Sequence, residues 1–589
     1  MKRIFLILGM CAAMTSLSAQ NIRYVTQNGA GSKTGISWND ASDDIQKMIN
    51  DLEQLKGGQV WVAKGTYVPV DHYGGKENLE LIIPSPPATD PQYDVLPFPF
   101  DQQREVSFVL KKNVEVYGGF IGNENKLSER DWEKYITTLN GQGIVYHVII
   151  SVGDVGSACL DGFHITGGHG ITEQPLPLGG DLYYTCFGNC SLWGSNLMMS
   201  NTAGGGISLL YSSPRLANLV IHDNKVSSYG GAIAMRHSSS ELSNIEIHNN
   251  DAYRHGGGMF INVSEPVLDN MNIHDNTSYY GGGVYDEVTK TLYRNVIIAN
   301  NTAYDYGGGI HMAVSESILV NVLIEDNELT GVGGYGGGIY NDRSYTTMIN
   351  MTMVNNKTSS NKYSGLYNYS YPVKMYNSIV YANNDVNSVD ETALIAQSTF
   401  DRCLIQNRHP SGNNLDGNTV FPDFVNPNND YHLLPNSQCV DFGEQSYVNP
   451  YTQIDLDGNP RVRNGNVDLG VYEHQWERFG TYMNGEGQKS LAGNNSQMET
   501  PWEEMTLSMY PNPVYSGDQI NIYLGKGSFE YNKQVEVKLF SIEGKLIYSK
   551  VYPNGNVRTT LPELTPGMYF FTLQTEDGTL YNQKLVINK

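Results

Sequence analysis

The feature that most constrains the fold is an internal repeat in the middle of the chain. Seven segments end in a pair of acidic or amide residues, and the second members of these pairs are 26, 26, 25, 26, 29 and 28 residues apart. Clusters of glycine advance in nearly the same steps. A period of this length indicates one supersecondary unit per repeat. The second members of the pairs are Asn224, Asn250, Asn276, Asn301, Asn327, Asn356 and Asn384.

Each repeat also contains a short segment in which apolar residues alternate. In the first copy Leu219 and Ile221 share one parity, and Val220 and His222 share the other. This is the period of a β-strand with one buried face, and no helical period is present. The sequence therefore predicts an all-β domain, a right-handed single-stranded parallel β-helix whose coils stack about 4.8 Å apart. We expect the repeated asparagines to form a ladder of side-chain amides along its axis.

The residues before the repeats predict an N-terminal cap. A helix with Ile45, Met48, Ile49 and Leu52 on one face follows Asp40, which we expect to be its N-cap residue. A solenoid needs such a cap because its terminal coil cannot bury its own open end.

Charge and the N-terminus indicate where the chain works. It has 589 residues and a net charge of −23, which argues against a nucleic-acid partner because that partner requires clustered cations. Residues 1–19, a short basic region followed by an apolar run, predict a secretory signal peptide. No later stretch has the roughly 20 apolar residues that a transmembrane helix needs. We therefore expect an exported chain without a transmembrane segment.

The C-terminal end predicts a separate domain. We interpret the polar residues 475–506 as a linker, and the short strands of residues 507–589 as a small β-sandwich. Within that range Tyr510-Pro511-Asn512-Pro513, Pro566-Gly567-Met568-Tyr569 and the final residues 584–589 resemble the type IX secretion C-terminal sorting domain. The resemblance implies that the type IX machinery recognises residues 507–589. It also implies a protein that is secreted or attached to the outer membrane at the cell surface.

The domain formed by residues 20–474 carries a second resemblance. Residues 161–168, 455–461 and 468–473 look like segments of the pectin-lyase-like and polymorphic-outer-membrane-protein group of β-helices. This resemblance implies the fold and leaves the activity open.

One motif points to enzymatic activity. Gly168-His169-Gly170 is similar to a motif of the pectin-hydrolysing β-helix enzymes, so His169 is a candidate catalytic residue. Glycoside hydrolysis also needs two carboxylates across the scissile bond, and the adjacent aspartates Asp43 and Asp44 fall in the cap instead. A lyase would need a base beside a cation. The basic residues of the repeats are few, namely Arg236, Arg254, Lys290, Arg294 and Arg343.

Two patterns in the sequence are candidate ion sites. His222, His248 and His274 share an outward position on consecutive coils, but later coils do not continue the column, so we favour a solvated face over a metal site. The segment containing Asp455, Asp457 and Asn459 offers oxygen ligands of the kind that Ca²⁺ prefers, without the loop that ends in Glu. We therefore predict a structural turn with no metal and no cofactor, and bound Ca²⁺ is the alternative.

The cysteines fall into two groups. Cys186 and Cys190 are four residues apart, and in an oxidising compartment they predict a disulfide. Cys159, Cys403 and Cys439 stand in apolar contexts, which predicts buried thiols.

The richest candidate surface is aromatic. Rings in a groove can bind sugars or a partner protein, and the alternative is a ladder that only stabilises neighbouring coils. We expect an exported, non-catalytic, adhesin-like protein that binds a glycan or a protein partner, with a polysaccharide lyase or glycoside hydrolase as the alternative. The candidate binding residues precede or follow the glycine clusters in register: Tyr229, Tyr280, Tyr306, Tyr335 and Tyr363, then Tyr285 and Tyr340, with His255 filling one gap.

Overall fold

The chain forms two compact units, residues 1–473 and 474–589, in a computed structural model. The structure describes residues 21–70, 104, 106–170, 184–185, 191–192, 195–196, 199–200, 202–359, 363–383, 392–393, 398–407, 412–448, 453–463, 465–474, 506–510, 514–515, 517, 519–526, 529–530, 534–541, 545–553, 556–575 and 580–588. Cys186, Cys190 and Asn384 lie outside these residues.

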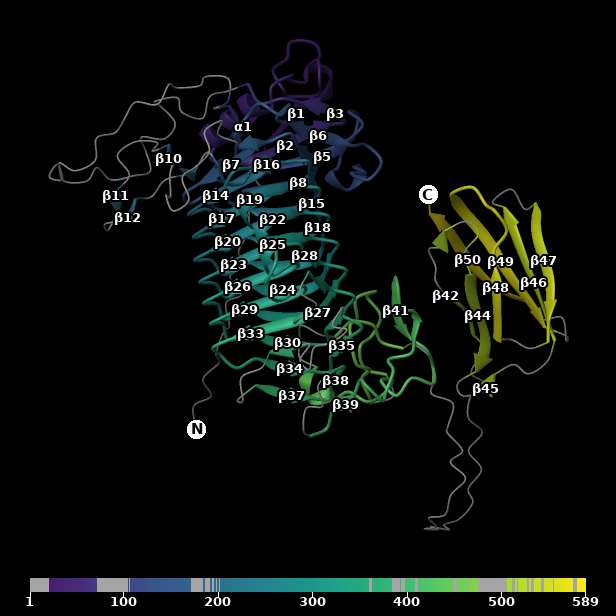
Figure 1. Cartoon of the computed structure of the whole chain (residues 1–589). Helices are drawn as coiled ribbons and strands as arrows, with labels where there is room; N and C mark the ends of the chain where they lie inside the picture. The colour runs from purple at the N-terminus through teal and green to yellow at the C-terminus, as the bar shows by residue number, and fades with distance from the viewer. Residues whose placement is uncertain are drawn as a thin grey trace, which may run out of the picture. The chain divides into compact units, whose positions relative to one another are not determined.

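The first unit is a parallel β-helix, and the fold-class prediction is confirmed. Its strands stack coil upon coil in three sheets (Figure 1). Sheet 1 contains β1 (Ile22–Val25), β2 (Gly58–Ala63), β3 (Gly65–Tyr67), β5 (Val114–Phe120), β6 (Thr137–Asn140), β8 (Cys159–Thr166), β15 (Arg215–His222), β18 (Glu241–His248), β21 (Val267–His274), β24 (Leu292–Ala299), β27 (Ile318–Glu325), β30 (Thr347–Ile349), β31 (Thr352–Val354), β34 (Lys374–Tyr376), β35 (Ile379–Tyr381), β37 (Thr399–Asp401), β38 (Leu404–Ile405) and β39 (Leu415–Asp416).

The other two sheets complete each coil. Sheet 2 contains β4 (Phe108–Val109), β7 (Ile149–Val152), β14 (Ile207–Leu210), β17 (Ile233–Arg236), β20 (Met259–Asn262), β23 (Val284–Glu287), β26 (Ile310–Ala313), β29 (Ile339–Asp342), β33 (Leu366–Tyr369) and β36 (Thr392–Ala393). Sheet 3 contains β9 (His169–Gly170), β16 (Lys225–Val226), β19 (Asp251–His255), β22 (Thr277–Tyr280), β25 (Thr302–Tyr306), β28 (Glu328–Leu329) and β32 (Lys357–Thr358).

Short elements lie outside the three sheets. Three are 3-10 helices, η1 (Trp38–Asp40), η2 (Leu127–Glu129) and η3 (Gln445–Tyr447). The others are paired strands: β10 (Tyr184–Thr185) with β13 (Met199–Ser200), β11 (Ser191–Leu192) with β12 (Ser195–Asn196), and β40 (Phe424–Asn426) with β41 (Asp430–Leu433).

A ladder of asparagine amides runs along the corner between sheets 1 and 3. The Nδ2 of Asn224 donates to the Oδ1 of Asn250, and the same bond repeats between successive coils at 2.9–3.0 Å. The ladder ends on Asn383, so the sequence analysis placed its last rung one residue too far, on Asn384. The residue before each earlier rung has a positive φ, and in this coil that residue is Ala382, with φ of 56°.

The glycine clusters are required by the turn between sheets 3 and 2. Gly281 has φ of 64°, a left-handed conformation that favours glycine. A Cβ on the next residue, Gly282, would lie 2.4 Å from the carbonyl oxygen of Gly308 in the following coil. Close stacking of the turns therefore selects glycine at both positions.

The N-terminal cap contains the expected helix with a different capping residue. Helix α1 (Ile45–Gln54) begins after Asp44, whose side chain accepts a 2.9 Å hydrogen bond from the backbone N–H of Lys47. Asp40 instead lies in η1, where it accepts a hydrogen bond from Ser32, so its assignment as the helix N-cap was wrong. The buried face of α1 packs into the same apolar core as the first coils.

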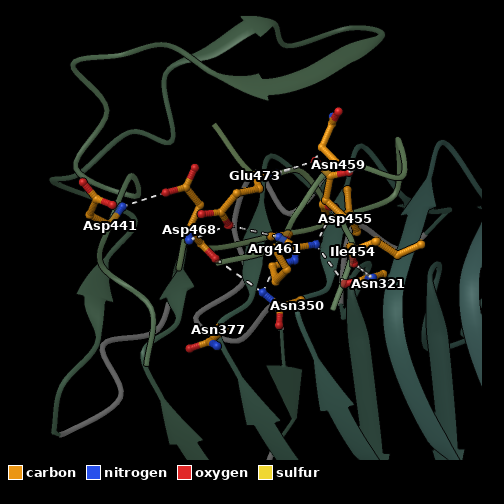
Figure 2. Close-up of polar contacts among 12 residues, drawn as sticks. Asn321, Asn350, Asn377, Asp441, Ile454, Asp455, Asn459, Arg461, Asp468 and Glu473 are labelled. Carbon is orange, nitrogen blue, oxygen red and sulfur yellow. Dashed lines mark hydrogen bonds and ion pairs between the residues drawn. The ribbon is translucent and has the colours of Figure 1, made fainter. Parts of the chain in front are cut away.

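The end of the first unit folds back over the last coils, and we call residues 441–448, 453–463 and 465–473 the strap. A second asparagine column in sheet 1 holds it (Figure 2). In the middle coils these amides bond to one another, as from Asn244 to Asn218 at 2.6 Å. In the last coils Asn321 donates to the carbonyl of Ile454, and Asn377 donates to that of Glu444.

A buried ion network anchors the strap (Figure 2). Arg461 is fully buried and donates to Asn321 Oδ1 at 2.8 Å and to the Val471 carbonyl at 2.6 Å, with Glu473 at 3.7 Å. Burial, together with Asp468, raises the pKa of Glu473 to about 9 although Arg461 opposes the shift. In the last coils the strap therefore supplies hydrogen-bond partners for the second asparagine column that neighbouring coils supply elsewhere. These contacts do not repeat from coil to coil.

The second unit, described from Thr506, is a β-sandwich of two sheets. One contains β42 (Thr506–Tyr510), β44 (Gln519–Lys526), β45 (Phe529–Glu530) and β48 (Asn556–Thr560). The other contains β43 (Val514–Tyr515), β46 (Val535–Ser541), β47 (Leu546–Tyr552), β49 (Gly567–Thr575) and β50 (Leu580–Asn588). Apolar residues of both sheets, among them Ile522, Val537 and Leu573, form a core separate from that of the β-helix.

Candidate functional site

The structure brings the predicted tyrosines into a column, which we call the first aromatic column. It follows the turn between sheets 3 and 2, one ring per coil. Neighbouring rings stack, with centroids 5.2 Å apart from His255 to Tyr280 and 5.7 Å apart from Tyr280 to Tyr306, at interplanar angles of 20° and 10°. The column is Tyr229, His255, Tyr280, Tyr306, Tyr335 and Tyr363.

A second aromatic column lies beside the first on the outer face of sheet 2. It places Tyr285 and Tyr340 in line with three rings that the sequence analysis did not single out. The two columns interlock, with ring centroids 4.6 Å apart from Tyr306 to Tyr340. The second column is Phe260, Tyr285, His311, Tyr340 and Tyr367. We call the two columns together the aromatic face.

The stacking decides what this face can offer a ligand. From Tyr229 to Tyr335, neighbouring rings of the first column cover one another's flat faces, so edges and hydroxyl groups remain. In the described part of the chain, the hydroxyls of Tyr280, Tyr285, Tyr306, Tyr335 and Tyr340 make no hydrogen bond. Burial, followed by nearby Asp305, raises the pKa of Tyr280 and of Tyr306, so these phenols stay neutral. The face therefore presents a row of neutral groups that both donate and accept hydrogen bonds.

More exposed tyrosines flank the first column on sheet 3. The exposed fractions of Tyr253 and Tyr304 are 66% and 51%, and the ring of Tyr304 lies 4.8 Å from that of Tyr279. Sequence reasoning missed this group, although Tyr253, Tyr279 and Tyr304 are also spaced by about one coil. These rings are accessible for stacking on a sugar, unlike those inside the columns.

Charges of both signs border the aromatic face. The Arg236 guanidinium lies 5.4 Å from the ring centroid of Tyr229 and 5.6 Å from that of Phe260. Further along the same edge of sheet 2, Asp342 pairs with Arg343 at 3.0 Å. Burial raises the pKa of Asp305. Among the described residues, this border therefore contains no block of cations suited to an anionic polymer.

The described residues do not complete a catalytic site around His169. Its pKa is lowered by burial and then by Arg104 and Lys225, both cations. Asp43 pairs with Lys33 in the cap, and Asp44 caps α1, so neither carboxylate serves His169. The pair of carboxylates that glycoside hydrolysis requires is not brought to this histidine by the described residues.

The basic residues considered for a lyase are dispersed. Arg236, Arg254 and Arg294 lie on β17, β19 and β24, which belong to three different sheets. Arg294 pairs with Asp269 at 2.7 Å, and Lys290 pairs with Glu316 at 3.3 Å.

The histidines of sheet 1 stack as a separate column. The ring centroids are 5.2 Å apart from His222 to His248 and from His248 to His274. His222 bonds to Asp223, and His274 bonds to Asp275 and Glu246. Across the described residues no group of three or more His, Cys, Asp or Glu side chains is arranged to hold a metal ion.

The acidic turn of the strap is held by hydrogen bonds within the chain. Asp455 accepts hydrogen bonds from the backbone N–H groups of Asp457, Asn459 and Glu473 at 2.7–3.0 Å. Its oxygens are thus engaged with the chain itself, as in an Asx turn.

The described cysteines are buried free thiols. Cys159, Cys403 and Cys439 form no disulfide, and burial raises the pKa of all three. The disulfide predicted between Cys186 and Cys190 falls outside the described residues and stays a prediction.

Comparison with known proteins identifies both units. Residues 185–353 match a family model described as a right-handed β-helix region, and residues 508–588 match one described as a secretion system C-terminal sorting domain. The chain is a β-helix protein with a type IX sorting domain. The sorting domain indicates export and attachment at the cell surface or outer membrane. In the described part of the chain, no helix has the length and apolar character needed to span a bilayer.

Two solved structures align with this β-helix protein at low similarity. They are the tailspike protein of Acinetobacter phage vB_ApiP_P1, with 8% identity and a TM-score of 0.25, and the enzymatically active domain of bacteriophage CBA120 tailspike protein 2, with 9% identity and a TM-score of 0.23. The alignments cover 92% of this chain and 75% and 73% of the tailspike chains. Similarity at this level does not inform function. No curated protein matches the chain.

Proposed function

We propose that this surface-located β-helix protein binds neutral glycans along its aromatic face without cleaving them. The observation that carries the proposal is the row of tyrosine hydroxyls with no hydrogen bond inside the described chain, at Tyr280, Tyr285, Tyr306, Tyr335 and Tyr340. Phenols and sugar hydroxyls are matched donors and acceptors. The exposed rings of Tyr253 and Tyr304 add flat surfaces for sugar stacking.

The charge of the chain favours a neutral ligand. At a net charge of −23, long-range electrostatics oppose the approach of an anionic polysaccharide. The cations bordering the aromatic face are already engaged: Arg236 lies against a ring, and Arg343 is paired with Asp342. An adhesin-like role at the cell surface follows from glycan binding combined with type IX export.

Glycan binding is tested with the purified chain on an array of neutral and anionic polysaccharides. We expect the native protein to bind one or more neutral glycans, and Tyr280→Ala and Tyr306→Ala to lose at least about tenfold in affinity, since one lost hydrogen-bonding and packing group is worth about 1–3 kcal/mol. Tyr345→Ala, an exposed ring outside the aromatic face, is the matched control and should bind as the native protein does.

Three results would overturn the proposal. One is an array on which the native protein binds nothing, and another is unchanged binding by both variants. The third is the release of sugar products that His169→Ala abolishes, which would support the hydrolase or lyase alternative.

The sorting domain supports a prediction about export. Deletion of residues 507–589 removes the sandwich that we propose contacts the type IX machinery, so the truncated chain should be retained in the periplasm. Surface labelling of intact cells, compared with the full-length chain, measures this. Normal surface display of the truncated chain would contradict the assignment.

A further inference from the structure

One histidine of the aromatic face is almost fully buried. His311 lies on β26 between Ile310 and Met312, whose side chains are fully buried in the interior of the β-helix. By the alternation of a strand, His311 points out of the coil. Only 6% of its surface is exposed, because rings of the aromatic face cover it.

Four tyrosine rings surround the imidazole of His311. The ring centroids of Tyr285 and Tyr340, its neighbours in the second column, lie 4.6 and 4.8 Å away. Those of Tyr280 and Tyr306, in the first column, lie 5.9 and 6.2 Å away. All four are inclined to the imidazole by 52–86°, so none of them is stacked on it.

Neither nitrogen of His311 has a hydrogen-bond partner in the described chain, and Nδ1 is fully enclosed. A buried polar atom without a partner destabilises the fold because its lost hydration is not replaced. Phenylalanine fits the same column at Phe260 with no such penalty. Burial, followed by His255, lowers the pKa of His311 to about 3, so the imidazole is neutral. It then offers one donor and one acceptor.

We propose that His311 is a specificity-determining residue of the aromatic face, which hydrogen-bonds a hydroxyl group of a neutral glycan. A hydroxyl both donates and accepts, and so can pair with either tautomer of the imidazole. Tyr280, Tyr306 and Tyr340 have no hydrogen bond in the described chain that holds their rings over His311. A sugar can therefore displace a ring edge without breaking a polar contact. This inference rests on the proposed glycan binding.

The test substitutes His311→Phe in the full chain, which keeps a planar ring and removes both nitrogens. Two quantities are measured for each protein: Tm, and affinity for soluble β-glucan, mannan, xylan and starch, with alginate as an anionic probe. We expect His311→Phe to keep or raise the native Tm and to lower the affinity for the bound neutral glycan at least tenfold. His222→Phe, the same change on the outer face of sheet 1, should leave the affinity at its native value.

Each other outcome has a defined meaning. A lower Tm in His311→Phe would show that the nitrogens stabilise the fold, and would overturn the inference. Native binding that His311→Phe leaves unchanged would overturn the inference and leave the proposed function standing. If the native protein binds none of the probes, the proposed function fails, and the role of His311 fails with it.

Discussion

Two kinds of column in the β-helix, the asparagine ladder and the aromatic columns, differ in where their hydrogen bonds go. In the asparagine ladder, Asn276 donates to Ile247, His274 and Asn301, and it accepts from both the backbone and the side chain of Asn250. In the aromatic face, tyrosines such as Tyr280 and Tyr306 stack at similar spacing while their hydroxyls bond to nothing in the described chain.

The difference separates a structural column from a candidate binding column. A fully bonded, buried amide has no capacity left for a ligand, and its loss leaves several buried groups unsatisfied. A phenol that packs but does not bond contributes its ring to stability and keeps its hydroxyl available. The amide corner should therefore respond to mutation through stability, and the aromatic face through binding.

The largest effect is expected where the strap replaces coil-to-coil bonding. Arg461→Met removes the bonds to Asn321, Gly470 and Val471 and the partner of Glu473, all within a buried site. We expect the free energy of unfolding of the β-helix to fall by about 3–5 kcal/mol, measured by urea denaturation. Arg343→Met, an exposed pair, should change it by less than about 1 kcal/mol. Equal losses of stability from the two substitutions would contradict a structural role for the buried contacts of the strap.

A somewhat smaller loss is expected within the ladder. Asn276→Ala removes five hydrogen bonds at a fully buried position and should lower the free energy of unfolding by about 2–4 kcal/mol, without changing glycan affinity. The control is Asn270→Gly, an exposed position of the second asparagine column in the same coil. It keeps the positive φ and should cost about 1 kcal/mol or less. A ladder variant that is as stable as the control would contradict the structural role.

A weaker effect is expected from pH where β41 contacts the strap through His432 and Asp457. Burial opposes protonation of His432, but hydrogen bonds of 2.8 Å to Asp430 and Asp457 outweigh it and raise the pKa of His432 to about 9. Because the folded protein holds this proton more tightly, its stabilisation is present below about pH 6.5 and is lost as pH rises to 9. The raised pKa of Glu473 acts in the same direction.

The free energy of unfolding should therefore fall between pH 6.5 and 9, by at most about 1.4 kcal/mol per pH unit for each group. Urea denaturation across this range measures the slope. It should be shallower in His432→Gln and native in His237→Gln, an exposed histidine at another corner. An unchanged slope in His432→Gln would contradict this role.

The repeat is what made much of this fold predictable. In a solenoid each residue's partner is its own counterpart in the next coil, so the spacing of Asn224, Asn250 and Asn276 contains the contact information. The alternation of Leu219 and Ile221 likewise indicated which side chains enter the core. The prediction of the last rung was wrong because the adjacent asparagines at 383 and 384 both fit the pattern. The residue with positive φ before the rung is an alanine, Ala382, in this coil.

Contacts that occur once were less accessible to sequence reasoning. Arg461 is 140 residues from its partner Asn321, and no spacing in the sequence predicts that pairing. One signal was present. Glu246, Asn272, Ile297 and Leu323 occupy the same outward position on successive coils, and this position changes from polar to apolar at Ile297. There the strap and neighbouring residues form a second apolar cluster. His311 was missed because it departs from the tyrosine pattern of its own column.

The most direct test of the central claim removes only the hydroxyls of the aromatic face. A chain with Tyr280→Phe, Tyr306→Phe, Tyr335→Phe and Tyr340→Phe keeps every stacked ring, and its affinity for the neutral glycan bound by the native chain is measured by titration calorimetry. We predict a native Tm and a loss of at least about tenfold in affinity, the equivalent of 1.4 kcal/mol. Native affinity in this variant would contradict the claim that the unbonded hydroxyls form the binding surface.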